Sequence, residues 1–107
     1  MDFESAAEKL TELGSPIRLA ALHYLLEAGE EGLTAGELQA RLRIPKSTLS
    51  HHVGHLIAAG LVSRVREGRM RRCRANRKEM QNLVTFLLRD CDGSTSGAVK
   101  SAKTTVG

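Results

Sequence analysis

The sequence contains few aromatic side chains and no tryptophan. Phe, Tyr and Trp together make up 3% of its 107 residues, while hydrophobic residues make up 41%. A hydrophobic core must therefore be built from Leu, Ile, Val and Ala. A chain of this length forms one small domain, and so thin a core often gains stability from a partner chain. We therefore expect a single domain that forms a homodimer.

Cysteines and long apolar segments are also scarce. The two cysteines, Cys73 and Cys91, are too few for a disulfide framework. No apolar run approaches the roughly 18 residues of a membrane-spanning helix, and no secretory signal pattern is present. We expect a cytoplasmic protein with reduced thiols and no membrane partner. The sequence also lacks a nucleophile–base pair, a phosphate loop and a metal-ligand cluster, which predicts that it is not an enzyme and needs no cofactor.

Acidic residues are nearly missing from the middle of the chain. Residues 38–78 contain eleven Lys and Arg and a single acid, Glu67, whereas residues 1–37 contain eight acids and two bases. The formal net charge of +4 therefore hides a strong segregation. Such segregation favours one basic face that meets a polyanion. An ordinary solvated run of charges is the alternative explanation.

Capping residues and apolar spacing predict five helices, over residues 3–13, 16–28, 35–42, 46–59 and 77–90. Ser15 and Pro16 are typical of a helix start. Thr34 and Glu37 form the sequence pattern of a capping box. The third helix is short, and only residues 43–45 separate it from the fourth. Two helices joined by so tight a turn predict a helix-turn-helix motif.

The pattern of side chains changes after the fourth helix. Apolar and polar residues alternate over 61–66, residues 67–69 are typical of a turn, and residues 70–75 follow as a second strand. This pattern predicts a β-hairpin with a basic tip. The predicted fold is mainly α with a β-hairpin wing, a winged helix-turn-helix in the order α-α-α-α-β-β-α. We expect residues 1–91 to form the DNA-binding and dimerisation domain. Residues 92–107 offer almost nothing to bury, which predicts a flexible C-terminal tail.

Four segments together resemble the ArsR/SmtB family of winged helix-turn-helix repressors over roughly residues 5–90. They are Leu33–Leu38, Ser47–Val53, Ala59–Val62 and Glu67–Arg69. The resemblance implies a homodimeric repressor that binds double-stranded DNA at an inverted-repeat operator. Each protomer would present its fourth helix to one half-site, and an inducer of unknown identity would release the protein from DNA.

The fourth helix carries the predicted base-reading side chains. At 100° per residue, its apolar residues face the core while small hydroxyls and an imidazole share the opposite face, a composition that suits the major groove. Arginines at a hairpin tip suit a narrow minor groove or its flanking phosphates. The residues predicted to contact DNA are Lys46, Ser47, Thr48, Ser50, His51, His55, Arg69 and Arg71.

The family's metal sites are not matched by this sequence. The resemblance places the cysteines of its arsenic sensors at positions that are here Thr34 and Gly36, and the zinc site of its last helix needs histidine, which residues 76–91 lack. His51 and His55 lie four residues apart but have no further ligand nearby. We therefore predict no metal site. The alternative is a thiol-based metalloid or redox sensor that uses Cys91 and Cys73.

The first and last helices carry the predicted dimer interface. The last helix has an apolar stripe at residues 80, 83, 84, 87 and 88, which is larger than one small domain can cover. Phe3 and Leu10 share one side of the first helix with residues 6, 7 and 13. We expect Phe3, Leu10, Leu83 and Leu87 to lie at the interface. A winged helix that has become a protein-docking module remains a further alternative.

Overall fold

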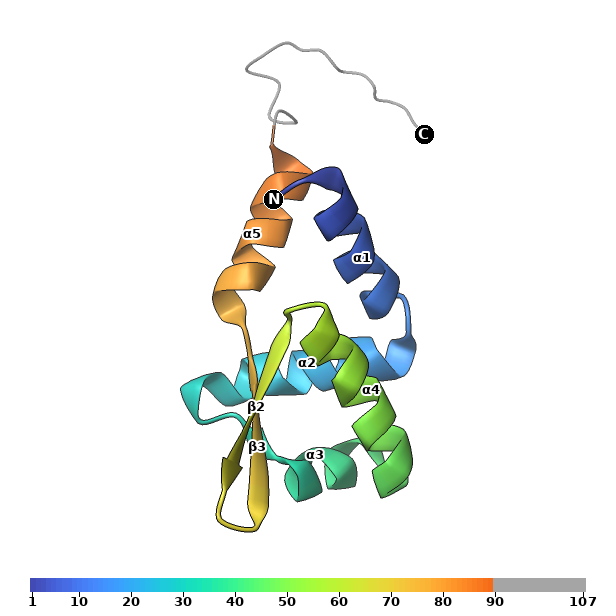
Figure 1. Ribbon diagram of the computed structural model, residues 1–107, viewed down its shortest axis with the longest axis vertical. Coiled ribbons are helices and arrows are strands. Elements are labelled where there is room, and N and C mark those ends of the chain that lie inside the picture. The colour runs from blue at the N-terminus through green and yellow to red at the C-terminus, as the bar shows by residue number, and fades with distance from the viewer. Residues whose placement is uncertain (90–107) are drawn as a thin grey trace.

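The structure is a computed structural model that describes residues 1–89 of the chain. Cys91 and the predicted tail over residues 92–107 lie outside the described residues. The helices are α1 (Phe3–Leu13), α2 (Pro16–Ala28), α3 (Ala35–Leu42), α4 (Lys46–Ala58) and α5 (Arg77–Leu88), with a 3-10 turn, η1 (Gly29–Glu31). The strands are β1 (Leu33–Thr34), β2 (Val62–Glu67) and β3 (Met70–Ala75). In Figure 1, α1 and α5 stand at one end of the molecule, with α3 and the tip of the β2–β3 hairpin at the other.

The predicted order of helices and hairpin is confirmed. The first three helices have the predicted bounds, α4 ends one residue early at Ala58, and α5 ends at Leu88 rather than at residue 90. The turn of the hairpin is tighter than predicted, because Glu67 pairs with Met70 across it. The prediction lacked η1 and β1. Both are too short for a periodic pattern to reveal them, since β1 has two residues.

Side-chain caps fix where the helices begin. Ser15 accepts a hydrogen bond from the backbone N–H of Arg18, and Thr34 forms the predicted capping box with Glu37. In that box the Thr34 backbone N–H donates to Glu37 Oε1 at 2.9 Å. This bond holds the pKa of Glu37 below its ordinary value. Because each cap satisfies N–H groups that the helix itself leaves unpaired, the short helix α3 is held at a defined start.

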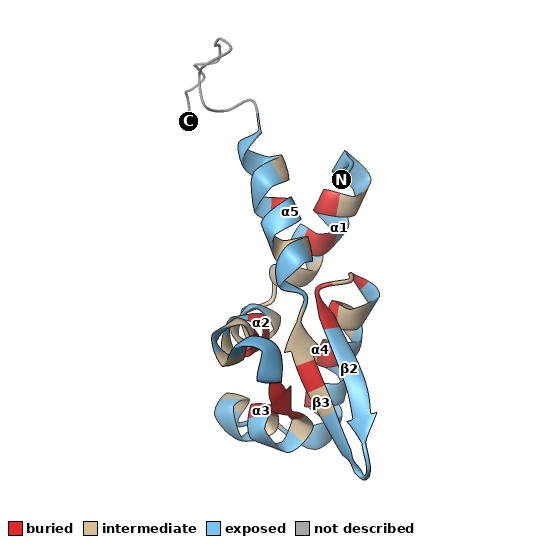
Figure 2. Ribbon diagram, turned by 90° about the vertical axis from the view of Figure 1, so that its left-hand side faces the viewer, coloured by how far each residue is buried: buried red, intermediate tan, exposed pale blue. Residues whose placement is uncertain are grey.

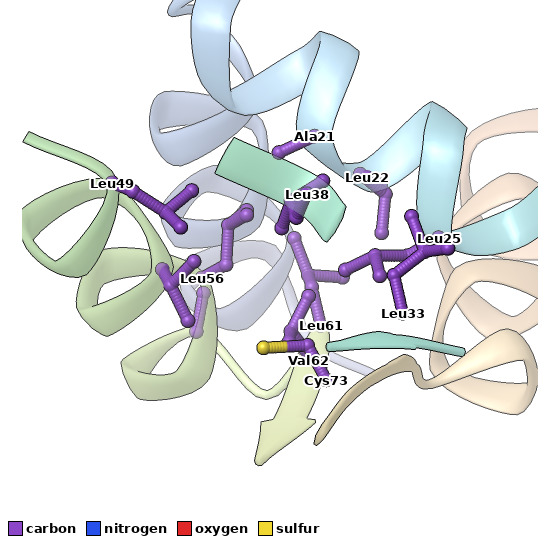
Figure 3. Close-up of a cluster of buried hydrophobic side chains, with 12 residues drawn as sticks. Ala21, Leu22, Leu25, Leu33, Leu38, Leu49, Leu56, Leu61, Val62 and Cys73 are labelled. Carbon is purple, nitrogen blue, oxygen red and sulfur yellow. The ribbon is translucent and has the colours of Figure 1, made fainter. Parts of the chain in front are cut away.

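The core is aliphatic, as the composition predicted. Its largest fully buried side chains include Leu22 and Leu25 of α2, Leu38 of α3, Leu56 of α4 and Leu61 before β2. Figure 3 shows these leucines converging between α2, α3 and α4 beside the base of the hairpin. Burying each contributes roughly 1.5–3 kcal/mol relative to exposure. The core thus fixes α4 and the base of the hairpin relative to each other.

A three-stranded antiparallel sheet anchors the hairpin. Its strand order is β1-β3-β2, and Leu33 of β1 pairs with Cys73 of β3. Gly32 makes this pairing possible, because it has φ +63° and a Cβ atom there would collide with the carbonyl oxygen of Cys73. Only glycine adopts this conformation without strain. The hairpin is therefore fixed to the segment that precedes α3.

Helices α1 and α5 contact each other through one polar and one aromatic pair. Lys9 Nζ lies 3.8 Å from Glu79 Oε2, and the rings of Phe3 and Phe86 pack edge to face with centroids 5.2 Å apart. Lys9 is buried, although the first helix was predicted to bury only apolar residues.

Among the described residues, no helix combines the length and apolarity that a membrane span requires.

Candidate nucleic-acid interface

Helix α4 presents a polar face to solvent while its apolar face enters the core. Leu49, Val53 and Leu56 are at most 3% exposed. The opposite face carries Ser47, Ser50, His51, Gly54 and Ala58, and all five are exposed. The predicted division of this helix into a core face and a free face is thus confirmed.

The first turn of α4 leaves its backbone donors available. Pro45 stands at the N-cap position and provides no side-chain hydrogen bond. Lys46 is exposed at the first helical position, and Thr48 is half-buried beside it. Uncapped N–H groups and the positive end of the helix dipole favour an anion at this position. The start of α4 therefore suits a phosphate group.

The register of the hairpin gathers three arginines on one face. Arg64 pairs with Cys73, and Arg66 pairs with Arg71. Because side chains alternate along a strand and paired residues share a face, Arg64, Arg66 and Arg71 project from the same side as the buried thiol of Cys73. Two like charges directly opposite each other destabilise a hairpin. An anionic partner would relieve this repulsion.

These arginines line a groove between the hairpin and α4. The groove has a volume of about 580 Å³. Its cationic side chains are Lys46, Arg64, Arg66, Arg69 and Arg71, and none of its lining residues is acidic. Its remaining lining residues are Thr34, Ala35, Gly36, Gln39, Leu49, Ser50, Val53, Met70 and Cys73. None of the five cations forms an ion pair with another residue of the described segment.

The arginines on the other face of the hairpin bind their own chain. Arg72 Nε donates to Glu67 Oε1 at 2.9 Å, and its Nη1 donates to the backbone oxygen of Glu31. Glu67 raises the pKa of Arg72 through this contact. Arg74 Nε donates to the backbone oxygen of Glu30 at 2.7 Å. Burial differs along the two strands, as Figure 2 shows, with the hairpin tip exposed and the middle of β3 buried.

The predicted DNA-contacting residues fall into three places. Lys46, Ser50, Arg69 and Arg71 line the groove. Ser47, Thr48 and His51 lie outside it on the first two turns of α4. His55 lies elsewhere, with Nδ1 3.0 Å from Glu12 Oε1 at the end of α1. The structure thus directs His55 toward α1, and its role in DNA contact stays a prediction.

Sequence reasoning missed two of the five cations of the groove, Arg64 and Arg66. It selected Arg69 and Arg71 because they lie nearest the hairpin tip. The signal that would have found the other two is the two-residue period of a strand, combined with the pairing of Arg66 with Arg71. The pairing depends on the turn, and the turn was predicted to be one residue longer.

Cys73, the cysteine within the described residues, lies in the core. Cys73 is 1% exposed, and burial raises its pKa, with the nearby charge of Arg64 acting in the opposite direction. A raised pKa lowers the fraction of reactive thiolate. The second predicted member of the thiol site, Cys91, lies outside the described residues. In the described part of the chain, no three His, Cys, Asp or Glu side chains gather in a metal-binding group.

The residues predicted for the dimer interface divide into exposed and buried ones. Phe3 is 82% exposed, Leu10 44% and Leu87 46%. Leu83 differs from the prediction, because it is 2% exposed within one chain and offers no surface to a partner. Val84 and Leu88 on the same helix remain exposed instead.

The arrangement of helices, hairpin and groove defines a winged helix-turn-helix protein. A model of the helix-turn-helix domain family matches residues 13–65. An uncharacterised HTH-type transcriptional regulator of Methanocaldococcus jannaschii is 36% identical over 66 residues, which cover 62% of this chain and 72% of the relative.

Solved structures of transcriptional regulators are similar to this chain. An ArsR-like transcriptional regulator from Rhodococcus sp. RHA1 is 29% identical with a TM-score of 0.69, over 81% of this chain and 79% of that one. The transcriptional repressor BigR from Xylella fastidiosa is 29% identical with a TM-score of 0.63, over 77% and 81%. The chain belongs to the HTH-type transcriptional regulators, and its fold is similar to that of ArsR-like regulators. Proteins of this class are regulators and not enzymes, as the sequence predicted.

Proposed function

We propose that this protein is a homodimeric repressor that binds an inverted-repeat operator in double-stranded DNA. The observation that carries the proposal is the groove between α4 and the hairpin. It contains five cations and no acid, next to the exposed hydroxyls of α4. Cations without local counter-charges are suited to phosphates, and serine and histidine side chains are suited to base edges.

The proposed binding mode places the exposed face of α4 in the major groove. Ser47, Ser50 and His51 then approach base edges, while Lys46 and the uncapped start of α4 meet a phosphate. Arg69 at the hairpin tip approaches the adjacent minor groove or its phosphates. Arg64, Arg66 and Arg71 lie between these two contacts and neutralise the backbone that separates the grooves.

The exposed apolar residues of α1 and α5 support the homodimer. Phe3, Leu10, Val84, Leu87 and Leu88 belong to these two helices, which stand together at the end of the molecule away from the hairpin tip (Figure 1). An apolar patch of this kind marks an association surface. We propose that residues 1–91 form one DNA-binding and dimerisation domain, and that a two-fold axis places two copies of α4 about 34–36 Å apart, one turn of DNA.

The repressor role rests on likeness to relatives. BigR is described as a transcriptional repressor. Binding of a dimer over a promoter would block transcription. An inducer would then shift the dimer toward a state with lower DNA affinity.

The dependence of DNA affinity on salt tests this proposal. The probe is a duplex selected with the wild-type chain from a randomised pool, and fluorescence anisotropy gives Kd at several salt concentrations. Each phosphate contact should contribute about −0.9 to the slope of log affinity against log salt. Arg66→Ala should reduce the magnitude of the slope by about this amount per protomer.

Arg72→Ala is the matched control. It removes the same charge from the same hairpin, but Arg72 is bound to Glu67 and Glu31 on the other face. Its slope should equal that of the wild type. A slope close to zero in the wild type would overturn the DNA-binding proposal and favour a winged helix that docks on protein. Equal slopes for the two variants would show that the groove does not hold the DNA backbone.

A further inference from the structure

Arg18 connects the end of α1 to the middle of α4. Its Nε donates to the backbone oxygen of Glu12 at 2.7 Å and lies 3.4 Å from Glu12 Oε1. Its Nη1 lies 3.1 Å from His52 Nδ1. The side chains of Arg18 and Glu12 are 16% and 20% exposed. One guanidinium on α2 thus contacts α1 and α4 at the same time.

The contact with Arg18 fixes the chemical state of His52. A guanidinium has five N–H donors and no acceptor, so Nδ1 of His52 must accept the bond and its proton must lie on Nε2. The ring is therefore neutral when the contact is made. Burial lowers the pKa of His52, and the charges of Arg18, His51 and His55 lower it further. Both effects favour the form that can accept from Arg18.

His52 is adjacent to His51, whose side chain is predicted to read bases. The centroid of its ring lies 5.5 Å from that of His51, and the ring of His51 lies 4.6 Å from that of His55. His55 in turn approaches Glu12 Oε1. The charged and titratable groups around His52 are therefore Arg18 from α2, Glu12 from α1, and His51 and His55 from α4.

We propose that Arg18 is a positioning residue for α4, and that protonation of His52 in mildly acidic solution breaks this contact and reduces specific DNA binding. The inference rests on the proposed function and names a regulation of the same site. A proton on Nδ1 removes the acceptor and places two cations 3.1 Å apart. Helix α4 then loses its polar link to Glu12 through Arg18, and its reading face is less firmly held.

The direction of the pH effect follows from the two states of His52. An ordinary histidine has a pKa of about 6.5, and the pKa of His52 in the folded chain lies below this value. The stabilisation that the Arg18–His52 contact gives to the folded chain is complete above about pH 6.5. It is lost as the pH falls through the lower pKa of folded His52. The affinities for selected and random DNA are compared because a change confined to phosphate contacts alters both alike, whereas a less firmly held reading face lowers their ratio.

The test measures this ratio between about pH 8 and about pH 5.5 at constant ionic strength. The probes are a duplex selected from a randomised pool and a random duplex of equal length. In the wild type we expect the ratio to fall about fivefold or more in acid, a typical coupling. His52→Asn places an amide oxygen near the position of Nδ1, which accepts at every pH, and should make the ratio nearly independent of pH.

Two substitutions at Arg18 test the geometry. Arg18→Gln should give a low ratio at every pH. Arg18→Lys keeps the charge but lacks the planar guanidinium, whose several N–H donors contact Glu12 and His52 together. Its ratio should therefore stay below that of the wild type. Thermal melting at both pH limits identifies any variant that has unfolded. In the free chain, the ¹⁵N shifts of His52 should show a proton on Nε2, and its pKa should rise in Arg18→Gln.

The outcomes are distinct. Specific DNA binding with a ratio independent of pH in the wild type overturns this inference and leaves the proposed function intact. A proton on Nδ1 of His52 in the neutral ring, or full restoration by Arg18→Lys, also overturns it. Absence of DNA binding at every pH overturns the proposed function and the regulation together.

Discussion

At the scale of single residues, the exposed face of α4 separates the reading of bases from the neutralisation of phosphates. Ser50 and His51 are exposed on that face, whereas the groove beside it is lined by cations. Hydroxyl and imidazole groups form directional hydrogen bonds with base edges, which differ between sequences. Arginine and lysine contacts to phosphates do not differ between sequences.

Replacing the predicted base readers should therefore change specificity. His51→Ala or Ser50→Ala should lower the free-energy difference between selected and random DNA by roughly 1–3 kcal/mol for each good contact. Arg69→Ala should weaken binding to both duplexes. Competitive binding with the two duplexes measures the difference. An unchanged specificity ratio in His51→Ala would show that this face of α4 is not the reader.

The thiols give a second prediction at the residue scale. Cys73 is buried with a raised pKa, so we expect it to react poorly with thiol reagents in the native chain. A double Cys73→Ala, Cys91→Ala variant should match the wild type in DNA affinity and in its response to arsenite, zinc and peroxide. The two proteins are titrated side by side. A response present only in the wild type would make the protein a thiol-based sensor.

At the scale of elements, the hairpin takes its position from β1 and Gly32. Gly32 has a positive φ and lies against the carbonyl oxygen of Cys73, so no side chain fits there. Leu33 then pairs with Cys73 and joins the hairpin to the segment that leads into α3. The distance between the arginine face and α4 is thus set by a short strand that the helical pattern of the sequence does not show.

Gly32→Ala should consequently destabilise the fold and weaken DNA binding together. The expected loss in free energy of unfolding exceeds about 1 kcal/mol, because both the conformation and the space exclude a methyl group. Gly36→Ala is the matched control, since Gly36 lies within α3 and a Cβ there meets no atom within 4 Å. It should stabilise by about 0.5–1 kcal/mol. Urea denaturation measures both, and equal stabilities would contradict this account of the hairpin.

At the scale of the whole molecule, apolar and basic surfaces lie at opposite ends. Phe3 and the exposed residues of α5 lie at the end formed by α1 and α5, and the groove lies between α4 and the hairpin (Figure 1). A dimer formed through the first end leaves the second end of both copies free. This arrangement suits a protein that binds two half-sites of DNA at once.

A charge placed in the apolar end should separate the dimer. Val84 is 47% exposed on α5, and Val84→Asp would oppose burial worth roughly 1.5–3 kcal/mol per copy. We expect a monomer in sedimentation analysis and a loss of operator binding at the same protein concentration. Leu19→Asp is the control, because Leu19 is similarly exposed, at 52%, on α2. A dimer that survives Val84→Asp would place the interface elsewhere.

The sequence by itself determined the order of elements and most of their boundaries. Caps such as Ser15 and the Thr34–Glu37 box act within a few residues of the chain. Apolar spacing likewise assigned Leu49, Val53 and Leu56 to the core face of α4. These signals are local, so they can be read without knowing which segments meet.

Only the tertiary structure decided which side chains act together. The pairing of Arg66 with Arg71 brings three arginines to the groove, while Arg72 on the other face binds Glu67. Leu83 is buried within its own chain although it shares a stripe with exposed Val84. Such outcomes depend on strand register and on contacts between residues far apart in the chain. Helical and strand periods give the face of each element, but only packing gives the neighbour that the face meets.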